Sequence, residues 1–178
     1  MTVPGITTRV GLGKDLHRLV EGRRFLLGGV ELPSEVGELG HSDGDVLAHA
    51  VCDAVLGAAA LGDIGSLFPP SDSGWKDADS MDLLRSVFAM AKEAGWRLGN
   101  LDCVVSCEWP KVLPFRDKIR DSLALALEAS PEMVFVKGKT GEGLGPVGEG
   151  RAVEAMAVCL LERAENQAGN PERPGNQA

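Results

Sequence analysis

The 178-residue sequence lacks several features that would place it in large classes of proteins. It has only four cysteines and no Cys-x-x-Cys pair, so we expect reduced thiols, typical of a cytosolic protein, rather than a disulfide framework. No apolar run reaches about 18 residues, and residues 1–10 contain no basic region followed by an apolar stretch. These absences predict a cytoplasmic protein that neither spans a membrane nor is exported. We interpret the cysteines as small core hydrophobes; they are Cys52, Cys103, Cys107 and Cys159.

Positive charge is also scarce. Lys and Arg number 18 against 26 Asp and Glu, which gives a net charge of -8. This balance argues against general binding to nucleic acid or to an anionic membrane surface, so any anionic ligand needs local positive charge. The Walker pattern of nucleoside triphosphatases is absent, and no Ser-His or Cys-His pair suited to covalent catalysis is found.

The three histidines are few, but their positions are informative. His17, His41 and His49 all lie near acidic residues in the N-terminal third of the chain. Imidazole and carboxylate groups suit zinc, and three protein ligands leave a fourth tetrahedral position for a substrate oxygen. An Asp-x-His pair at a strand end, with one histidine from a helix, would supply three ligands. A lone histidine beside an aspartate is more often a satisfied hydrogen-bonding residue, but the clustering of all three favours a metal site.

Turn and capping signals divide the chain into short elements. The expected strands are Thr8–Gly13, Arg24–Val30 with a bulge or close approach at Gly28-Gly29, Arg97–Cys107 and Met133–Lys137; the expected helices run from the Ser42-Asp43-Gly44 start signal to near Leu61, from Ser80 as cap to Glu93, and over Phe115–Ala129. Residues Ala152–Arg163 are ambiguous, because their local propensity favours a helix that tertiary pairing can override. No repeat or linker is found, so we expect one domain over residues 1–165 and a disordered polar tail over 166–178.

The first expected helix is predicted to carry chemistry on one face. Asp45, His49 and Asp53 are spaced by four residues and share that face, beside a face of small residues that permits tight packing. Asp45 or Asp53 is a candidate acceptor that fixes the tautomer of an imidazole, and the alternative is a solvated helix charge. His41 precedes the helix N-terminus, where free amides favour an anion such as phosphate.

A glycine-rich loop follows the last of the four expected strands. Lys137–Gly145 offers backbone amides, two ammonium groups, a hydroxyl and a carboxylate. Glu142 there is a candidate ligand for a hard cation between phosphates. Taken alone, the loop favours an ordinary surface loop over a phosphate-binding one.

Four segments carry a more specific signal. They are Asp15-Leu16-His17, His41–Asp45 with His49, Leu61–Gly65 with Phe68-Pro69, and Pro110–Pro114. In order and spacing they closely resemble the 2-C-methyl-D-erythritol 2,4-cyclodiphosphate synthase family of the non-mevalonate isoprenoid pathway, from about Thr8 to Leu161. The resemblance implies an α/β (α+β) single-domain subunit with a mixed β-sheet packed by helices, a fold like Bacillus chorismate mutase, and a homotrimer with active sites between subunits. It also implies that the ambiguous segment Ala152–Leu161 is a strand.

The resemblance further implies a set of site residues and cofactors. Zn²⁺ or another divalent transition metal would be bound by Asp15, His17 and His49, and Glu142 would bind Mg²⁺ or Mn²⁺ with the substrate diphosphate. His41 and Thr140 would assist the transition state. The implied substrate-binding residues are Asp15, Leu16, His17, His41, Ser42, Asp63, Ile64, Gly65, Phe68, Pro69, Pro70, Ser71, Asp72, Cys107, Glu108, Trp109, Pro110, Lys111, Val112, Leu113, Lys139, Thr140, Gly141 and Glu142.

The implied reaction is an intramolecular phosphoryl transfer on a cytidine diphosphate-linked substrate. The 2-phosphate of 4-diphosphocytidyl-2-C-methyl-D-erythritol 2-phosphate attacks the β-phosphorus and expels CMP, a step that metals assist by neutralising charge. The chain departs from the family pattern at Lys139-Thr140-Gly141, where one hydroxyl remains, at Pro70 and at Trp109. It also lacks the arginine that precedes the Gly-Glu-Gly element in relatives and helps to hold an anion or isoprenoid near the trimer axis, for which Arg151 is a candidate substitute.

Two other functions remain open on the sequence. A zinc-dependent hydrolase would use Asp45 or Asp63 as general base, but the segment around Pro110-Lys111 would then have no purpose. A trimeric ligand-binding module without catalysis would fit the changed loop, but it would not need all the candidate metal ligands.

Overall fold

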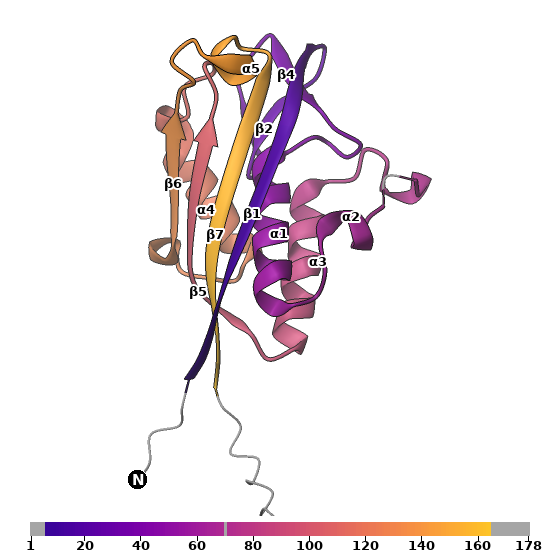
Figure 1. Cartoon of the computed structure of the whole chain (residues 1–178), viewed down its shortest axis with the longest axis vertical. Helices are drawn as coiled ribbons and strands as arrows, with labels where there is room; N and C mark the ends of the chain where they lie inside the picture. Colours follow the sequence, from indigo (N-terminus) through magenta and orange to yellow (C-terminus); the bar gives the residue numbers. More distant parts are fainter. Residues whose placement is uncertain (1–5, 70, 165–178) are drawn as a thin grey trace, which may run out of the picture.

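The computed structural model describes residues 6–69 and 71–164, in which a mixed sheet carries its long helices on one side (Figure 1). The strands are β1 (Ile6–Glu21), β2 (Phe25–Leu27), β3 (Val30–Leu32), β4 (Val36–Leu39), β5 (Arg97–Ser106), β6 (Val134–Lys139) and β7 (Ala152–Ala164). The helices are α1 (Val46–Ala59), α2 (Ile64–Leu67), α3 (Ser80–Glu93), α4 (Arg116–Ala126) and α5 (Gly145–Gly148), with 3-10 turns at Ser73–Trp75, Leu113–Phe115 and Pro131–Met133. The tail at 166–178 and Pro70 lie outside the described residues.

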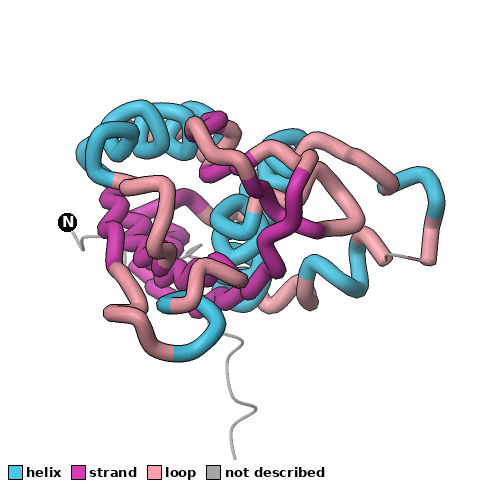
Figure 2. The backbone as a smooth tube through the Cα atoms, turned by 90° about the horizontal axis from the view of Figure 1, so that it is seen from above, coloured by secondary structure: helices cyan, strands magenta, loops and turns pink. Residues whose placement is uncertain are grey.

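The main sheet has the strand order β4-β1-β7-β5-β6, in which β5 and β6 are parallel and the other neighbours antiparallel. Viewed along the strands, the long helices lie to one side of the sheet (Figure 2). This arrangement confirms the predicted mixed sheet packed by helices. The ambiguous segment Ala152–Arg163 is a strand, as the resemblance implied, because β7 pairs with β1 on one side and β5 on the other.

Strand β1 and helix α1 pack unusually closely. Side chains alternate between the two faces of a strand, and Gly11 and Gly13 on β1 face the helix. A Cβ atom at these positions would lie 1.8 Å from the carbonyl oxygen of Ala54 and 1.9 Å from that of Ala50. The small helix face predicted from the sequence therefore rests directly on the backbone of β1, and the next residues of that strand face are Asp15 and His17.

Several predicted boundaries were wrong. Helix α1 begins at Val46, after the expected start signal, because Asp45 is its N-cap and accepts hydrogen bonds from the amides of Leu47 and Ala48. Helix α3 spans the predicted residues, but its N-cap is Asp79 rather than Ser80. Strand β1 is longer than predicted, so its Asp15-Leu16-His17 segment lies within the strand and not at its end.

The predicted strand Arg24–Val30 is divided into β2 and β3. Gly28 and Gly29 form the connecting turn with φ of 57° and 76°, a conformation that glycine adopts without steric cost. The Asp45 carboxylate accepts the Gly28 amide at 3.0 Å and the Gly29 amide at 2.6 Å. One buried carboxylate therefore ties this hairpin to the start of α1.

The face of the sheet opposite the long helices carries exposed apolar side chains. They are Val10 and Leu12 on β1, Phe135 on β6, and Met156 and Val158 on β7. All four cysteines are buried and free, as predicted for core residues. Among residues 6–69 and 71–164, no helix has both the length and the apolar character needed to cross a membrane.

Candidate metal centre and neighbouring pockets

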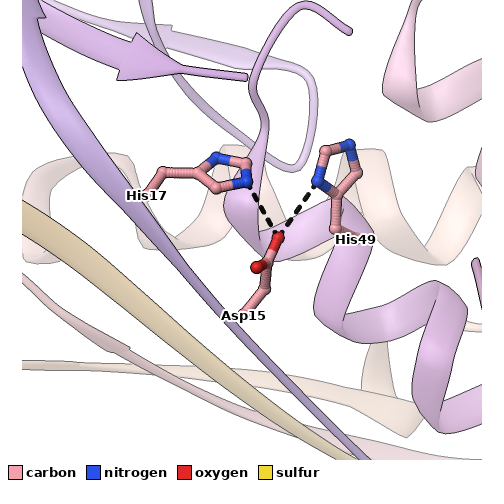
Figure 3. Close-up of side chains that lie close together, drawn as sticks. All are labelled: Asp15, His17 and His49. Carbon is pink, nitrogen blue, oxygen red and sulfur yellow. Dashed lines mark hydrogen bonds and ion pairs between the residues drawn. The ribbon is translucent and has the colours of Figure 1, made fainter. Parts of the chain in front are cut away.

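Three side chains converge where β1 meets α1 (Figure 3). The Asp15 Oδ2 atom lies 3.0 Å from His17 Nε2 and 3.1 Å from His49 Nδ1. One ligand atom from each residue lies within 4.8 Å of the others, and no other such group of His, Cys, Asp and Glu occurs in the described part of the chain. Asp15 and His17 share a face because they are two residues apart on a strand, and the close packing beside Gly13 brings His49 to them.

The orientation of His17 is set by a backbone carbonyl. His17 Nδ1 lies 2.7 Å from the oxygen of Gly44, and a carbonyl oxygen only accepts hydrogen bonds. Nδ1 therefore carries a proton, and Nε2 is the nitrogen that faces Asp15 Oδ2 at 3.0 Å. Metal-bound histidines commonly have their second nitrogen held by an outer carbonyl or carboxylate in this way.

The ionisable groups around His17 shift one another's pKa values. Burial alone would raise the pKa of Asp15, but hydrogen bonds with His17 and His49 outweigh it and hold that pKa below its usual range. Burial would lower the pKa of His17, but contacts with Asp15 and Glu38 raise it to about 10. A centre that attracts protons this strongly without a cation suits a positively charged ligand.

Glu38 is a member of this centre that sequence reasoning missed. It is fully buried on β4, its Oε2 lies 3.4 Å from His17 Nδ1 and accepts the Val46 amide at 2.7 Å, and burial raises its pKa to about 8. Its Oε1 has no hydrogen-bond partner within the described structure. The sequence signal that could have identified Glu38 is that it is the single acidic residue in the short, otherwise uncharged strand β4.

His49 is held by hydroxyl groups rather than by the carboxylates that we predicted. Its Nε2 lies 2.9 Å from Ser42 Oγ and 2.9 Å from Ser80 Oγ. Asp45 points instead to the β2–β3 turn, and Asp53 accepts the Ile64 amide at 2.8 Å. The predicted role of Asp45 or Asp53 in fixing a tautomer is therefore wrong. Because Asp45 is fully buried and caps α1, it is also unsuited to act as the general base of a hydrolase.

A cavity of about 200 Å³ opens beside the three converging residues. We call it the histidine pocket; it is lined by His17, His41, Ser42, His49, Ile64, Gly65, Phe68, Trp75 and Leu83. Five residues from the predicted substrate site, from His41 to Phe68, are thus brought together with two of the candidate metal ligands. Trp75 and Leu83 were not predicted, and Trp75 stacks edge-on against Phe68 with ring centres 4.9 Å apart.

A larger cavity of about 660 Å³ lies at the β5–β6 end of the sheet. We call it the lysine pocket; it is lined by Cys107, Lys111, Val112, Leu113, Arg116, Val136, Lys137, Gly138, Lys139, Thr140 and Glu142. The implied substrate-binding segment Cys107–Leu113 and the glycine-rich loop therefore meet in one pocket. Arg116 was missed by sequence reasoning, because it lies in a helix whose facing could not be assigned. Its guanidinium and three lysines give this acidic chain the local positive charge that an anionic ligand requires.

Other predicted residues lie outside both pockets. The Leu16 side chain is half exposed on the opposite face of β1 and lines a third cavity with Arg18 and Arg151. Trp109 is 69% exposed, with the Lys111 ammonium 4.9 Å from its ring centre.

Four further predicted residues have identified hydrogen bonds. Asp63 caps α2 and accepts the Ser66 amide, Asp72 accepts the Gly74 amide, Glu108 accepts the Gly143 amide at 3.4 Å, and the Thr140 hydroxyl donates to Glu142. Ser71 is exposed, and the Gly141 carbonyl accepts the Leu144 amide at 2.8 Å.

Comparisons with known proteins all find members of one family. The model of the YgbB family matches residues 8–162. The chain is 56% identical over 153 residues to the 2-C-methyl-D-erythritol 2,4-cyclodiphosphate synthase of Treponema denticola, covering 86% of this chain and 95% of that one. It is 54% identical over 162 residues to the synthase of Gloeobacter violaceus, covering 91% and 99%.

Solved structures agree with the sequence relatives. A CDP-bound 2C-methyl-D-erythritol-2,4-cyclodiphosphate synthase is 40% identical with a TM-score of 0.79, covering 86% of this chain and 99% of that one. The bifunctional IspDF of Campylobacter jejuni is 37% identical with a TM-score of 0.87, and the match covers 91% of this chain and 44% of that longer one.

Proposed function

The chain belongs to the YgbB family, and we propose the following course for its reaction on that basis. The enzyme cyclises 4-diphosphocytidyl-2-C-methyl-D-erythritol 2-phosphate to 2-C-methyl-D-erythritol 2,4-cyclodiphosphate and releases CMP, a lyase reaction in isoprenoid precursor synthesis. The structural observation that carries this function is the convergence of Asp15, His17 and His49 at one point beside the histidine pocket.

The three converging residues fit a divalent transition metal, which we propose to be zinc. One carboxylate oxygen and two imidazole nitrogens form a donor set typical of zinc, and the outer hydrogen bond from His17 to Gly44 is of the expected kind. When bound, such an ion neutralises phosphate charge and helps to align the attacking and leaving oxygens. Because the protein supplies three ligands, a coordination position remains for a substrate oxygen.

The bond changes need no nucleophile from the protein. An oxygen of the 2-phosphate forms a bond to the β-phosphorus, the bond from that phosphorus to the oxygen bridging to CMP breaks, and that oxygen leaves on CMP. The side chains have to hold two negatively charged groups in line, and such positioning supplies roughly 7 to 11 kcal/mol in favourable cases. We assign the methylerythritol phosphate end to the histidine pocket, where His41, Ser42 and the α2 N-terminus face the cavity.

The lysine pocket is proposed to bind the cytidine diphosphate end. A relative that is 40% identical is described as a CDP-bound form, and in this chain the pocket combines apolar side chains with cationic ones. Lys139 and Thr140 are proposed to contact phosphate oxygens, and Thr140 to assist the transition state together with His41. Glu142 is proposed to bind Mg²⁺ or Mn²⁺ with the diphosphate, because a carboxylate oxygen suits a hard cation.

We further propose that three copies of the chain form a homotrimer with a Bacillus chorismate mutase-like subunit fold. The histidine pocket and the lysine pocket share no lining residue, so one substrate reaches both most simply across a subunit boundary. The exposed apolar side chains on the face opposite the helices would be covered in such a trimer. Leu12→Glu, on that face, should give monomers in sedimentation velocity runs, and an unchanged trimer would contradict this assignment.

The cellular site is proposed to be the cytoplasm, where reducing conditions keep the four free cysteines as thiols. The activity is tested by phosphorus NMR of the product formed from the cytidyl substrate. We expect cyclic diphosphate and CMP, loss of turnover after chelation, and recovery after Zn²⁺ is restored. A linear phosphate product would indicate a hydrolase, and binding without turnover would indicate a ligand-binding module.

A further inference from the structure

We propose that Ser80 and Asp43 are positioning residues that set which nitrogen of His49 faces the metal. Neither residue belongs to the site implied by the family resemblance, and the sequence suggested only helix-start roles for them. The proposal rests on the proposed function in one respect, namely that the centre formed by Asp15, His17 and His49 binds a metal ion.

Ser80 connects helix α3 to the metal centre. It is fully buried, and its Oγ lies 2.9 Å from His49 Nε2 on α1. On its other side, Ser80 is held at two points by the Asp43 carboxylate. Its hydroxyl donates to Asp43 Oδ1 at 2.5 Å, and its backbone amide donates to Oδ2 at 3.2 Å.

The chemistry of these groups fixes which of them donates and which accepts in each hydrogen bond. An ionised carboxylate only accepts hydrogen bonds, so the Ser80 hydroxyl hydrogen is directed to Asp43. Ser80 Oγ then presents a lone pair to His49, and the hydrogen between them comes from His49 Nε2. His49 Nδ1 faces Asp15 Oδ2 at 3.1 Å, so with the outer contact held at Nε2 it is the nitrogen presented to a metal.

The surrounding contacts hold this arrangement in place. The Asp43 amide donates to the Ala78 carbonyl at 3.0 Å, which joins the loop before α1 to the loop before α3. Ser42 Oγ lies 2.9 Å from His49 Nε2 and 3.1 Å from Ser80 Oγ, so it shares the Nε2 hydrogen and can donate its own to the second lone pair of Ser80. The hydrogen and both lone pairs of the Ser80 hydroxyl therefore have partners, which limits its ability to turn and donate to the imidazole.

The two metal-facing histidines consequently make their outer hydrogen bonds through different ring nitrogens. His17 is protonated on Nδ1 by its contact with Gly44, whereas His49 is protonated on Nε2 by its contact with Ser80. Loss of the outer partner of a metal-bound histidine commonly weakens metal binding by 10-fold to 100-fold. We expect that range for the loss of Ser80 or of its anchor.

The test measures the zinc dissociation constant of the full-length protein by competition with a chromophoric chelator. Ser80→Ala removes the hydroxyl that accepts from His49. Asp43→Asn offers an amide that can donate to Ser80 and so reverse the direction of the hydrogen bonds from His49 through Ser80 to Asp43. Each variant should raise the dissociation constant by roughly 10-fold to 100-fold. The double variant should be no weaker than the worse single variant, because Asp43 acts through Ser80. Ser86→Ala, an exposed serine on the same helix, is the matched control and should bind zinc like the parent protein.

The visible spectrum of the Co²⁺-loaded protein gives a second readout, because it reports the geometry at the metal rather than stability. Asp43→Asn should change this spectrum, whereas Ser86→Ala should not. Zinc affinity in Ser80→Ala or Asp43→Asn within about twofold of the parent value would overturn the proposal, as would additive losses in the double variant. If the parent protein bound no zinc, the proposed function itself would fail, so the two failures are distinguishable. Should Ser80→Ala not fold, Asp43→Asn alone carries the test.

Discussion

Replacement of Gly13 by alanine tests the idea that one close contact builds both the core and the metal centre. The added Cβ would lie 1.9 Å from the Ala50 carbonyl oxygen and 2.7 Å from the Ala54 amide nitrogen. Real Cβ contacts are essentially never shorter than 3.0 Å, so β1 and α1 must separate locally by about 1.1 Å. Both near atoms belong to the backbone, and no side-chain rotation can relieve the clash.

This separation has two measurable consequences. Overpacking of a well-packed core commonly costs about 1 to 3 kcal/mol, so the free energy of unfolding should fall by an amount in or above this range. Asp15 follows Gly13 on β1, and His49 precedes Ala50 on α1, so the ligand atoms separate as well. Metal sites require ligand distances within about 0.2 Å of their ideal values, and zinc affinity should therefore fall in the variant that remains folded.

The matched control is Gly57→Ala, the same substitution in helix α1. Gly57 is exposed, and a Cβ there meets no atom within 4 Å, so the change should raise the free energy of unfolding by about 0.5 to 1 kcal/mol. Both variants are compared by urea denaturation of the metal-free protein at one protomer concentration, and by chelator competition for zinc. Equal stability and zinc affinity of Gly13→Ala and the parent protein would refute the reasoning.

Three further predictions concern the two pockets. His49→Ala should abolish stoichiometric zinc while leaving the circular dichroism spectrum unchanged, because it removes a ligand and little core packing; zinc retained by atomic absorption would contradict the assignment. Arg116→Ala should raise the dissociation constant for CDP about 10-fold, or about 1.4 kcal/mol, in calorimetry, whereas Arg120→Ala, on the same helix but outside the pocket lining, should not. Burial raises the pKa of Cys107 to about 11, so its alkylation by iodoacetamide should be slow at pH 8 and accelerate as the pH approaches that pKa; a rate at pH 8 equal to that of free cysteine would argue against it.

The sequence was most informative where chemistry depends on local spacing. Asp15 and His17 share a face because strand side chains alternate, and the helix carrying His49 was identified by its small-residue face and its start signal. The order of short motifs also identified the family, because metal and phosphate chemistry restricts which residues can stand at those positions. Helix α3 was located within its observed bounds for a similar reason, since its apolar period is regular.

The tertiary structure decided the features that depend on partners distant in the chain. Ala152–Arg163 became a strand because two neighbours, β1 and β5, pair with its backbone along its length, which outweighs a local helix preference. Asp45 looked like a residue of the chemical face, yet it turned inward because the β2–β3 turn offered it two unpaired amides.

The outer partners of the metal centre were hidden from the sequence for the same reason. Ser80 reaches His49 from a helix 31 positions further along the chain, and Glu38 reaches His17 from β4. Neither residue type signals such a role by itself, because a serine in the first turn of a helix and a glutamate in a short edge strand are common at protein surfaces. The sequence by itself therefore determined the candidate ligand set and the family, whereas only the packing of α1 and α3 against the sheet decided which groups contact those residues.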